Sequence, residues 1–258
     1  MKRRHKILVA GLALFVLLTA AGGTMWLHGR DTLWRIVSEN CVPAAEHGTP
    51  SRCVDVSIGK GAAAGDVVFK DKSGPLQYLV IPTARITGIE DAQLLRQEVP
   101  LYFADAWRAR RWMETIHGAP IPAEDVAIAL NSAWSRSQDQ LHLHVSCVRP
   151  DLKARLKTLS VAPSDSWTSL PGGWQGHPYL VRSIVGDTLE GIDPIRDVAA
   201  HVPGAADAMG HQAIAVVGAT LPDGRHGFWL LEDSIAPLSG WLGGIEGDVQ
   251  DHTCAVLQ

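Results

Sequence analysis

The segment Gln138-Asp139-Gln140-Leu141-His142-Leu143-His144-Val145-Ser146-Cys147 alternates apolar and polar side chains along most of its length. In a β-strand, successive side chains point to opposite faces of the sheet. The segment therefore predicts a strand with two rows of side chains: Leu141, Leu143 and Val145 on one face, and Gln140, His142 and His144 on the other. The histidine row can hold a phosphate, a metal ion or a reacting phosphorus atom, and the predicted function depends on which of these it holds.

Strand and helix patterns lie on both sides of this segment. Strands are expected over residues 67–69, 77–82, 126–131, 141–149, 213–220 and 226–232. Helices are expected over residues 31–40, 89–97, 101–117, 150–159 and 194–201, and loops over 41–57, 72–75, 132–139 and the Gly-rich stretch 170–177. Asp193 and Pro194 form a typical N-cap and first helical residue for the last of these helices. The order of elements predicts an α+β fold built on an antiparallel sheet with packed helices.

The first thirty residues differ from the rest of the chain. Lys2, Arg3, Arg4 and Lys6 precede the run 7–27, which contains no Asp, Glu, Lys or Arg. Its 21 residues match the roughly 20 that a helix needs to cross a bilayer. The preceding basic residues predict a cytoplasmic N-terminus and an exported remainder. We therefore expect residues 1–30 to form a membrane anchor and 31–258 one exported domain; a cleaved signal peptide, with its cut near 18–23, is the alternative.

The exported part is acidic. Residues 1–30 hold five of the 23 Lys and Arg and none of the 27 Asp and Glu, which leaves a net charge of −9 on residues 31–258. An acidic surface argues against nucleic acid as the main partner and against simple electrostatic docking on anionic lipid. A phosphate pocket stays compatible with this charge because it needs only a few local donors.

All four cysteines follow the apolar run, in the part expected to be exported, where disulfides form readily. Cys41 and Cys53 flank a loop that contains Pro and Gly, and pairing them leaves Cys147 with Cys254. Four cysteines allow three pairings, so the sequence leaves the connectivity open. Four buried thiols are the alternative, and the spacing typical of a zinc finger is absent from the sequence.

The two histidines of the central segment allow more than one function. As a catalytic site, His142 or His144 would attack phosphorus from a rigid strand, with neighbours that stabilise the developing charge. As a metal site, they would need further ligands, and no spacing selects among the candidates Asp139, His177, His211 and His252. Two surface histidines on a half-buried strand are the plain structural alternative.

Further segments give the histidines a context. The run 77–86 (QYLVIPTARI) and the polar loop that contains Asn131, Ser137 and Gln138 resemble the histidine-triad superfamily. The similarity to the CDP-diacylglycerol pyrophosphatase family is closer and covers nearly the whole chain. It rests on segments 74–79 (GPLQYL), 130–132 (LNS), 142–151 (HLHVSCVRPD), 170–173 (LPGG), 176–177 (GH) and 251–254 (DHTC).

This resemblance implies a HIT-like sheet with the triad strand at its centre and assigns roles to its residues. It makes His142 the nucleophile and gives His144 contacts to the phosphate or to the leaving group. Gln140 stands where the general triad has its first histidine, and an amide cannot carry the positive charge of an imidazolium. The residues expected to bind substrate phosphates are Asn131, Ser137, Gln138, Gln77 and His177, the last in the Gly-rich loop, which lets the backbone approach closely.

The resemblance also implies an activity. We expect hydrolysis of CDP-diacylglycerol to CMP and phosphatidate through a covalent nucleotidyl-histidine, with no cofactor and no metal in the site. The expected partners are this lipid and the membrane, and the expected location is the bacterial inner membrane with the catalytic domain in the periplasm. Two other functions stay open: a nucleotidyltransferase that uses the same intermediate, and a non-catalytic exported module that binds a metal or a nucleotide.

Overall fold

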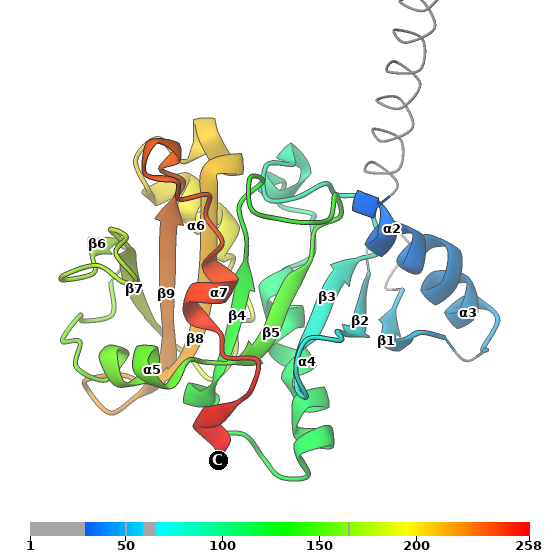
Figure 1. The fold of residues 1–258 in the computed structure, drawn as a ribbon, viewed down its shortest axis with the longest axis horizontal. Helices are drawn as coiled ribbons and strands as arrows, with labels where there is room; N and C mark the ends of the chain where they lie inside the picture. Colours follow the sequence, from blue (N-terminus) through cyan, green and yellow to red (C-terminus); the bar gives the residue numbers. More distant parts are fainter. Residues whose placement is uncertain (1–28, 50, 59–64, 165) are drawn as a thin grey trace, which may run out of the picture.

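The computed structural model describes residues 29–49, 51–58, 65–164 and 166–258 (Figure 1). Within these residues, nine strands form one antiparallel sheet in the order β1-β2-β3-β5-β4-β8-β9-β7-β6. The strands are β1 (Cys53–Ser57), β2 (Asp66–Lys70), β3 (Tyr78–Pro82), β4 (Val126–Leu130), β5 (Leu143–Cys147), β6 (Thr168–Ser169), β7 (Leu180–Val185), β8 (Gln212–Thr220) and β9 (His226–Ser234). The α+β class with an antiparallel sheet is therefore confirmed.

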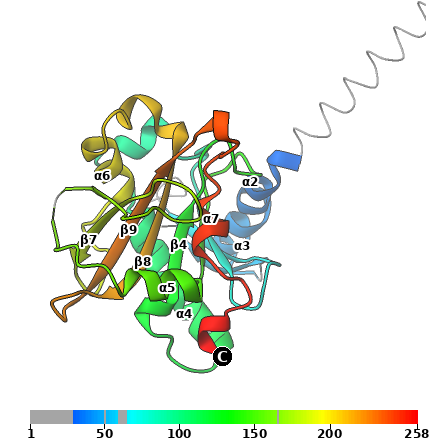
Figure 2. The same cartoon turned by 60° about the vertical axis from the view of Figure 1, so that its left-hand side comes forward.

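The α-helices are α2 (Thr32–Ile36), α3 (Val42–Glu46), α4 (Tyr102–His117), α5 (Pro150–Leu156), α6 (Pro194–His201) and α7 (Ile245–Val249). A π-helical turn, η1 (Val37–Cys41), joins α2 to α3. The 3₁₀ turns are η3 (Ala92–Leu95), η4 (Ala123–Asp125), η5 (Ala206–His211), η6 (Pro237–Ser239) and η7 (Ala255–Leu257). Figures 1 and 2 show α4 on one side of the central strands and α7 on the other.

β5 is an inner strand of the sheet, between β3 and β4, and its two rows of side chains face different surroundings. Leu143 and Val145 are fully buried in the main hydrophobic core, together with Tyr102 and Phe103 of α4. His144 points to the opposite side, toward α7, where its Nδ1 meets Glu246. The alternation predicted from the sequence is thus present, and it directs the histidine row away from the core.

The expected strand over 141–149 is shorter in the structure. β5 begins at Leu143 because Leu141 and His142 lie before the first residue paired with β3 or β4. Leu141 instead donates its backbone N–H to the carbonyl of Ile86, in the loop after β3. His142 consequently lies just before the first residue of β5, outside the hydrogen-bonded strand pairs.

The prediction of a loop over 41–57 is wrong at both ends of this range. The helix that begins at Thr32 continues through η1 and α3 to Glu46, and β1 occupies residues 53–57. Cys41 is fully buried with Val67 and Leu79 in a small core, separate from the two larger ones. This packing extends the helical segment beyond the point where the local pattern ends. The sequence also gave no signal for β7 or for α7.

Both disulfides inferred by pairing the nearest cysteines are present. Cys41–Cys53 holds η1 against β1, and Cys147–Cys254 joins the end of β5 to the C-terminal turn. The helix expected over 89–97 is only the 3₁₀ turn η3. α4 and α6 agree closely with their expected bounds: Gly118, whose φ is 80°, is the C-cap that stops α4, and the side chain of Asp193 caps α6. The strands expected at 213–220 and 226–232 form the hairpin β8–β9.

The predicted anchor over 7–27 lies outside the described residues. In the part of the chain that the structure describes, every helix is too short or too polar to span a bilayer.

The two disulfides should differ in their contribution to stability. The Cys147–Cys254 bridge spans 107 residues and Cys41–Cys53 spans 12. The loop-entropy model therefore predicts that replacing the first pair by serine lowers the free energy of unfolding by about 2 kcal/mol more than replacing the second. Urea unfolding of the full chain in mild detergent, followed by tryptophan fluorescence, measures both losses. Equal losses, or a larger loss for the short loop, would contradict the prediction.

Candidate active site

A cleft of about 710 Å³ lies beside the histidine end of β5, between α2, the β2–β3 hairpin and α7. Its apolar wall includes Leu33, Ile36, Phe69 and Leu79. His142, His144 and Glu246 line its polar side. The two imidazole rings are adjacent, with centroids 4.9 Å apart and planes inclined by 63°. The cleft therefore brings the histidine row into contact with a space large enough for a ligand.

His142 is held as a neutral imidazole. Its Nδ1 lies 2.7 Å from the backbone carbonyl oxygen of Gln140, which can only accept a hydrogen bond, so Nδ1 carries the proton. Burial, with a smaller effect from neighbouring His144, lowers the pKa of His142 to about 4. Among the described residues no group hydrogen-bonds to Nε2. His142 thus presents an unprotonated nitrogen in the cleft at neutral pH, which is the form that acts as a nucleophile.

His144 is oriented by a carboxylate. Its Nδ1 lies 3.0 Å from Oε1 of Glu246, and its other ring nitrogen, Nε2, is buried without a hydrogen-bond partner in the described part of the chain. Because Nδ1 donates to Glu246, the ring orientation is fixed and Nε2 is left for a ligand.

Glu246 is the centre of a wider network. Its Oε1 also lies 3.2 Å from Nε2 of His252 and accepts from the side-chain amide of Gln77 at 3.0 Å. Its Oε2 accepts from Nδ2 of Asn131 at 3.1 Å. Burial by itself raises the pKa of Glu246, but the hydrogen bonds from His144, His252 and Asn131 outweigh it and hold the pKa far below its usual range. Glu246 is therefore a charged carboxylate at neutral pH.

Glu246 is not among the site residues predicted from the sequence. Glu246 lies in the first turn of α7, a helix of five residues. The backbone N–H of Glu246 donates to Oδ1 of Asn131, and this hydrogen bond fixes the start of the helix. Asn131 thus contacts Glu246 through both atoms of its amide and is not among the side chains that line the cleft. The only sequence signal was an acidic residue six positions before His252.

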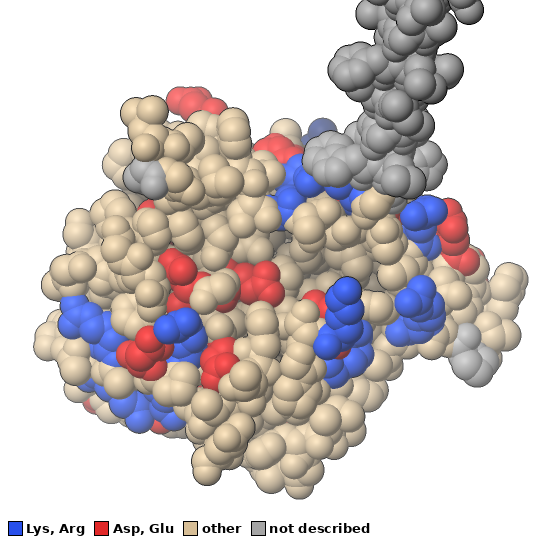
Figure 3. Space-filling model, in the orientation of Figure 1, with Lys and Arg blue, Asp and Glu red and all other residues tan. Residues whose placement is uncertain are grey.

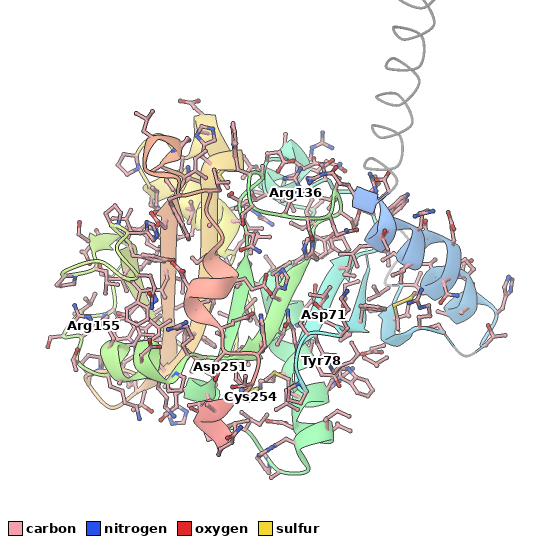
Figure 4. The ribbon with its side chains drawn as sticks, in the orientation of Figure 1. Asp71, Tyr78, Arg136, Arg155, Asp251 and Cys254 are labelled. Carbon is pink, nitrogen blue, oxygen red and sulfur yellow. A yellow bond between two sulfur atoms is a disulfide. The ribbon has the colours of Figure 1, made fainter. Side chains whose placement is uncertain are left out.

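Basic residues along one rim of the cleft, which we call the cationic rim, were also not predicted from the sequence. Three basic residues line the cleft: Arg52 just before β1, Lys70 at the end of β2, and Lys72 just after it. Burial lowers the pKa of Lys70, whose Nζ donates to the carbonyls of Asp71 and Gly74. Figure 3 shows Lys and Arg side chains on one side of the hollow and acidic side chains on the other, and Figure 4 places Asp71 at the cationic side. The rim can bind the negative charge of a phosphate group.

The remaining predicted residues fall in three places. Ser137 and Gln138 line the cleft, and the Gln138 side chain also holds the start of α2, accepting from the N–H of Leu33 and donating to the carbonyl of Gly29. Gln140 is fully buried and its amide donates to the carbonyls of Pro82 and Ala84 at the end of β3. His177 does not line the cleft; its ring stacks on Trp241 with centroids 3.9 Å apart.

The residues considered as metal ligands lie in different parts of the structure. His252 joins the Glu246 network, Asp139 pairs with Arg30, and His211 contacts Trp134. Across residues 29–258, apart from the few that the structure does not describe, no three His, Cys, Asp or Glu side chains come together in a group that could hold a metal ion.

An antiparallel α+β fold that presents a neutral imidazole, a carboxylate-bound imidazole and a cationic rim to one cleft has the arrangement of a hydrolase that acts on phosphate groups. The model of the family described as CDP-diacylglycerol pyrophosphatase matches residues 28–258. A CDP-diacylglycerol pyrophosphatase of Yersinia pestis is 41% identical over 250 residues, which cover 95% of this chain and 93% of that protein. The chain belongs to the CDP-diacylglycerol pyrophosphatase family.

Replacement of Glu246 by Gln should impair turnover while preserving the fold. The amide keeps the size of the side chain but loses the charge that orients His144, so we expect kcat on CDP-diacylglycerol to fall by about 100-fold, with little change in KM. Asp248→Asn is the matched control because Asp248 lies on the same helix and binds Tyr179 instead of the histidines. Equal activity of Glu246→Gln and the control would contradict this role of Glu246.

Proposed function

We propose that this protein hydrolyses the diphosphate bond of CDP-diacylglycerol, giving CMP and phosphatidate, and that His142 is the nucleophile. The family supplies the substrate. The observation that supports His142 is its protonation state: Nδ1 is committed to the carbonyl of Gln140, the pKa is lowered to about 4, and Nε2 is left in the cleft.

In the proposed reaction, Nε2 of His142 attacks the cytidylyl phosphorus in line with the bond to the bridging oxygen. The P–N bond forms as the P–O bond breaks, and phosphatidate leaves with the bridging oxygen as part of its phosphate. Because phosphatidate is a stable anion, its departure needs little help from a general acid. Water then attacks the same phosphorus and loses a proton to solvent as the new P–O bond forms. The P–N bond breaks, and CMP leaves while His142 returns to the neutral form.

Negative charge on the phosphoryl oxygens grows during both steps, and the polar side of the cleft is arranged to stabilise it. Nε2 of His144, which has no partner among the described residues, is placed beside the His142 ring. This position allows Nε2 of His144 to contact a phosphoryl oxygen of the substrate. Arg52, Lys70 and Lys72 balance the charge of the second phosphate from the opposite rim.

We further propose that the sheet is related to that of the histidine-triad (HIT) superfamily, because β5, which carries the histidine row, is an inner strand between β3 and β4. We also propose that residues 7–27 anchor the protein in the bacterial inner membrane, with the domain in the periplasm. Two disulfides and a lipid substrate support this location. The cleft is suited to such a lipid because Leu33, Ile36 and Leu79 offer apolar surface beside the phosphate-binding rim.

Loss of the His142 imidazole should abolish the reaction. We expect His142→Ala to lower kcat on CDP-diacylglycerol by at least about 1,000-fold, as for loss of an enzyme nucleophile. CDP-diacylglycerol labelled on the cytidylyl phosphorus should leave acid-labile label on the wild-type protein after a rapid quench, and none on the variant. His177→Ala is a suitable control because His177 stacks on Trp241 outside the cleft. Turnover close to wild type in His142→Ala would refute the mechanism.

The pH dependence follows from the lowered pKa of His142. The neutral form is the nucleophile, so kcat/KM is maintained above the pKa and falls as the pH drops through about 4. An ordinary histidine would give the same loss near pH 6.5. Measurement of kcat/KM from neutral pH downward, with circular dichroism to verify that the fold persists, separates these outcomes. An acid limb centred near the ordinary histidine value would contradict the proposed state of His142.

A further inference from the structure

Exposed apolar side chains gather at one end of the molecule. Seven large hydrophobic side chains are exposed in the described residues, and four of them lie at this end, in loops or in the 3₁₀ turns within them: Leu95 (39% exposed), Trp134 (58%), Leu238 (107%) and Leu242 (42%). We call the loops that carry these four residues the apical face. In Figures 1 and 2 they lie at the same end as the start of α2.

Hydrogen bonds tie these loops to one another. The β4–β5 loop carries Trp134, and its Ser132 donates through the backbone N–H to Gly243 and through the hydroxyl to Leu242, in the loop that carries Leu238 and Leu242. In the same β4–β5 loop, Arg136 pairs with Glu90, just before η3 and Leu95. The apical face is therefore one connected surface rather than a set of scattered side chains.

The same β4–β5 loop binds the first described residues of the chain. Arg30 forms an ion pair of 2.7 Å with Asp139, and the carbonyl of Gly29 accepts from Gln138. The apolar run 7–27 ends two residues before Gly29. Two residues reach at most about 7 Å. If the run spans a bilayer, as proposed above, the surface of that bilayer must lie close to the apical face.

The charges at this end suit a lipid surface without strong charge. Arg30 pairs with Asp139, Arg85 with Asp31, and Arg136 with Glu90. These pairs add no net charge to the face, and Asp91 and Asp207 beside Leu95 and Trp134 make it slightly acidic. Contact with a lipid surface therefore depends on apolar side chains and on an exposed tryptophan, which favours the membrane interface.

We propose that the apical face docks on the bilayer, with Trp134, Leu238 and Leu242 inserted at the interface. This inference rests on the proposed anchor and deepens the proposed function. The β4–β5 loop that would contact the lipid through Trp134 also lines the cleft through Ser137 and Gln138. Docking therefore sets the cleft beside the surface from which a lipid substrate must rise.

The direct test uses the full chain in nanodiscs of phosphatidylcholine, prepared with and without bromine on the acyl chains. The emission of Trp134 is obtained as the difference between wild type and Trp134→Phe. We expect brominated lipid to quench this difference signal. Ile116→Trp is the control, because Ile116 is 60% exposed near the far end of α4, and its added emission should be unaffected. A Trp134 signal that bromine leaves unchanged, whether open to solvent or covered by a second copy of the chain, overturns the proposal.

A second measurement keeps this result separate from the proposed function. The triple variant W134S/L238S/L242S should lose about tenfold in kcat/KM on bilayer CDP-diacylglycerol, equivalent to about 1.4 kcal/mol, and stay within about twofold of wild type on a dispersed short-chain substrate. Equal loss on both substrates would refute docking as the cause. If the wild-type protein hydrolysed neither substrate, the proposed function would fail, and the quenching result alone would decide whether the face docks.

Discussion

The buried carboxylate of Glu246 is the constraint on which the site depends. Removing a charged carboxylate from water is costly unless several donors surround it. The donors come from four separate parts of the chain: Gln77 just before β3, Asn131 just after β4, His144 in β5 and His252 in the C-terminal tail. Because each donor must reach the same two oxygen atoms, the network fixes how these parts meet. The Cys147–Cys254 disulfide fixes the same tail from its other side.

The two histidines differ although they stand two residues apart. His142 lies before the ladder of β5, binds a neutral carbonyl, and has its pKa lowered by burial. His144 lies within the ladder and binds a carboxylate. One segment thereby supplies an unprotonated ring nitrogen in the cleft and, beside it, an imidazole whose orientation is set by a carboxylate. Such division between adjacent groups is typical of sites in which the surroundings set the chemical role.

Local pattern predicted the parts of the fold that depend on local physics. The hairpin β8–β9 and the helix α4 follow from periodicity and from their turn residues, and α6 follows from the Asp193 cap. The extension of the first helix to Glu46 was not predictable, because burial of Cys41 against β2 and β3 stabilises it. α7 was not predictable for a related reason. A five-residue helix has almost no periodic signal, and a contact with Asn131, distant in the chain, sets its start.

The sequence by itself determined the strand, the direction of its histidine row and the family, because alternation in a strand and joined motifs are properties of the chain order. The tertiary structure decided which neighbours each imidazole has. It placed Glu246 beside His144, brought Arg52 and Lys72 to the rim, turned the Gln140 amide toward the end of β3, and left His177 on Trp241. These outcomes depend on contacts between residues far apart in the chain, and no local pattern records such contacts. Gln77 and Glu246, for example, are hydrogen-bonded although 169 positions separate them in the sequence.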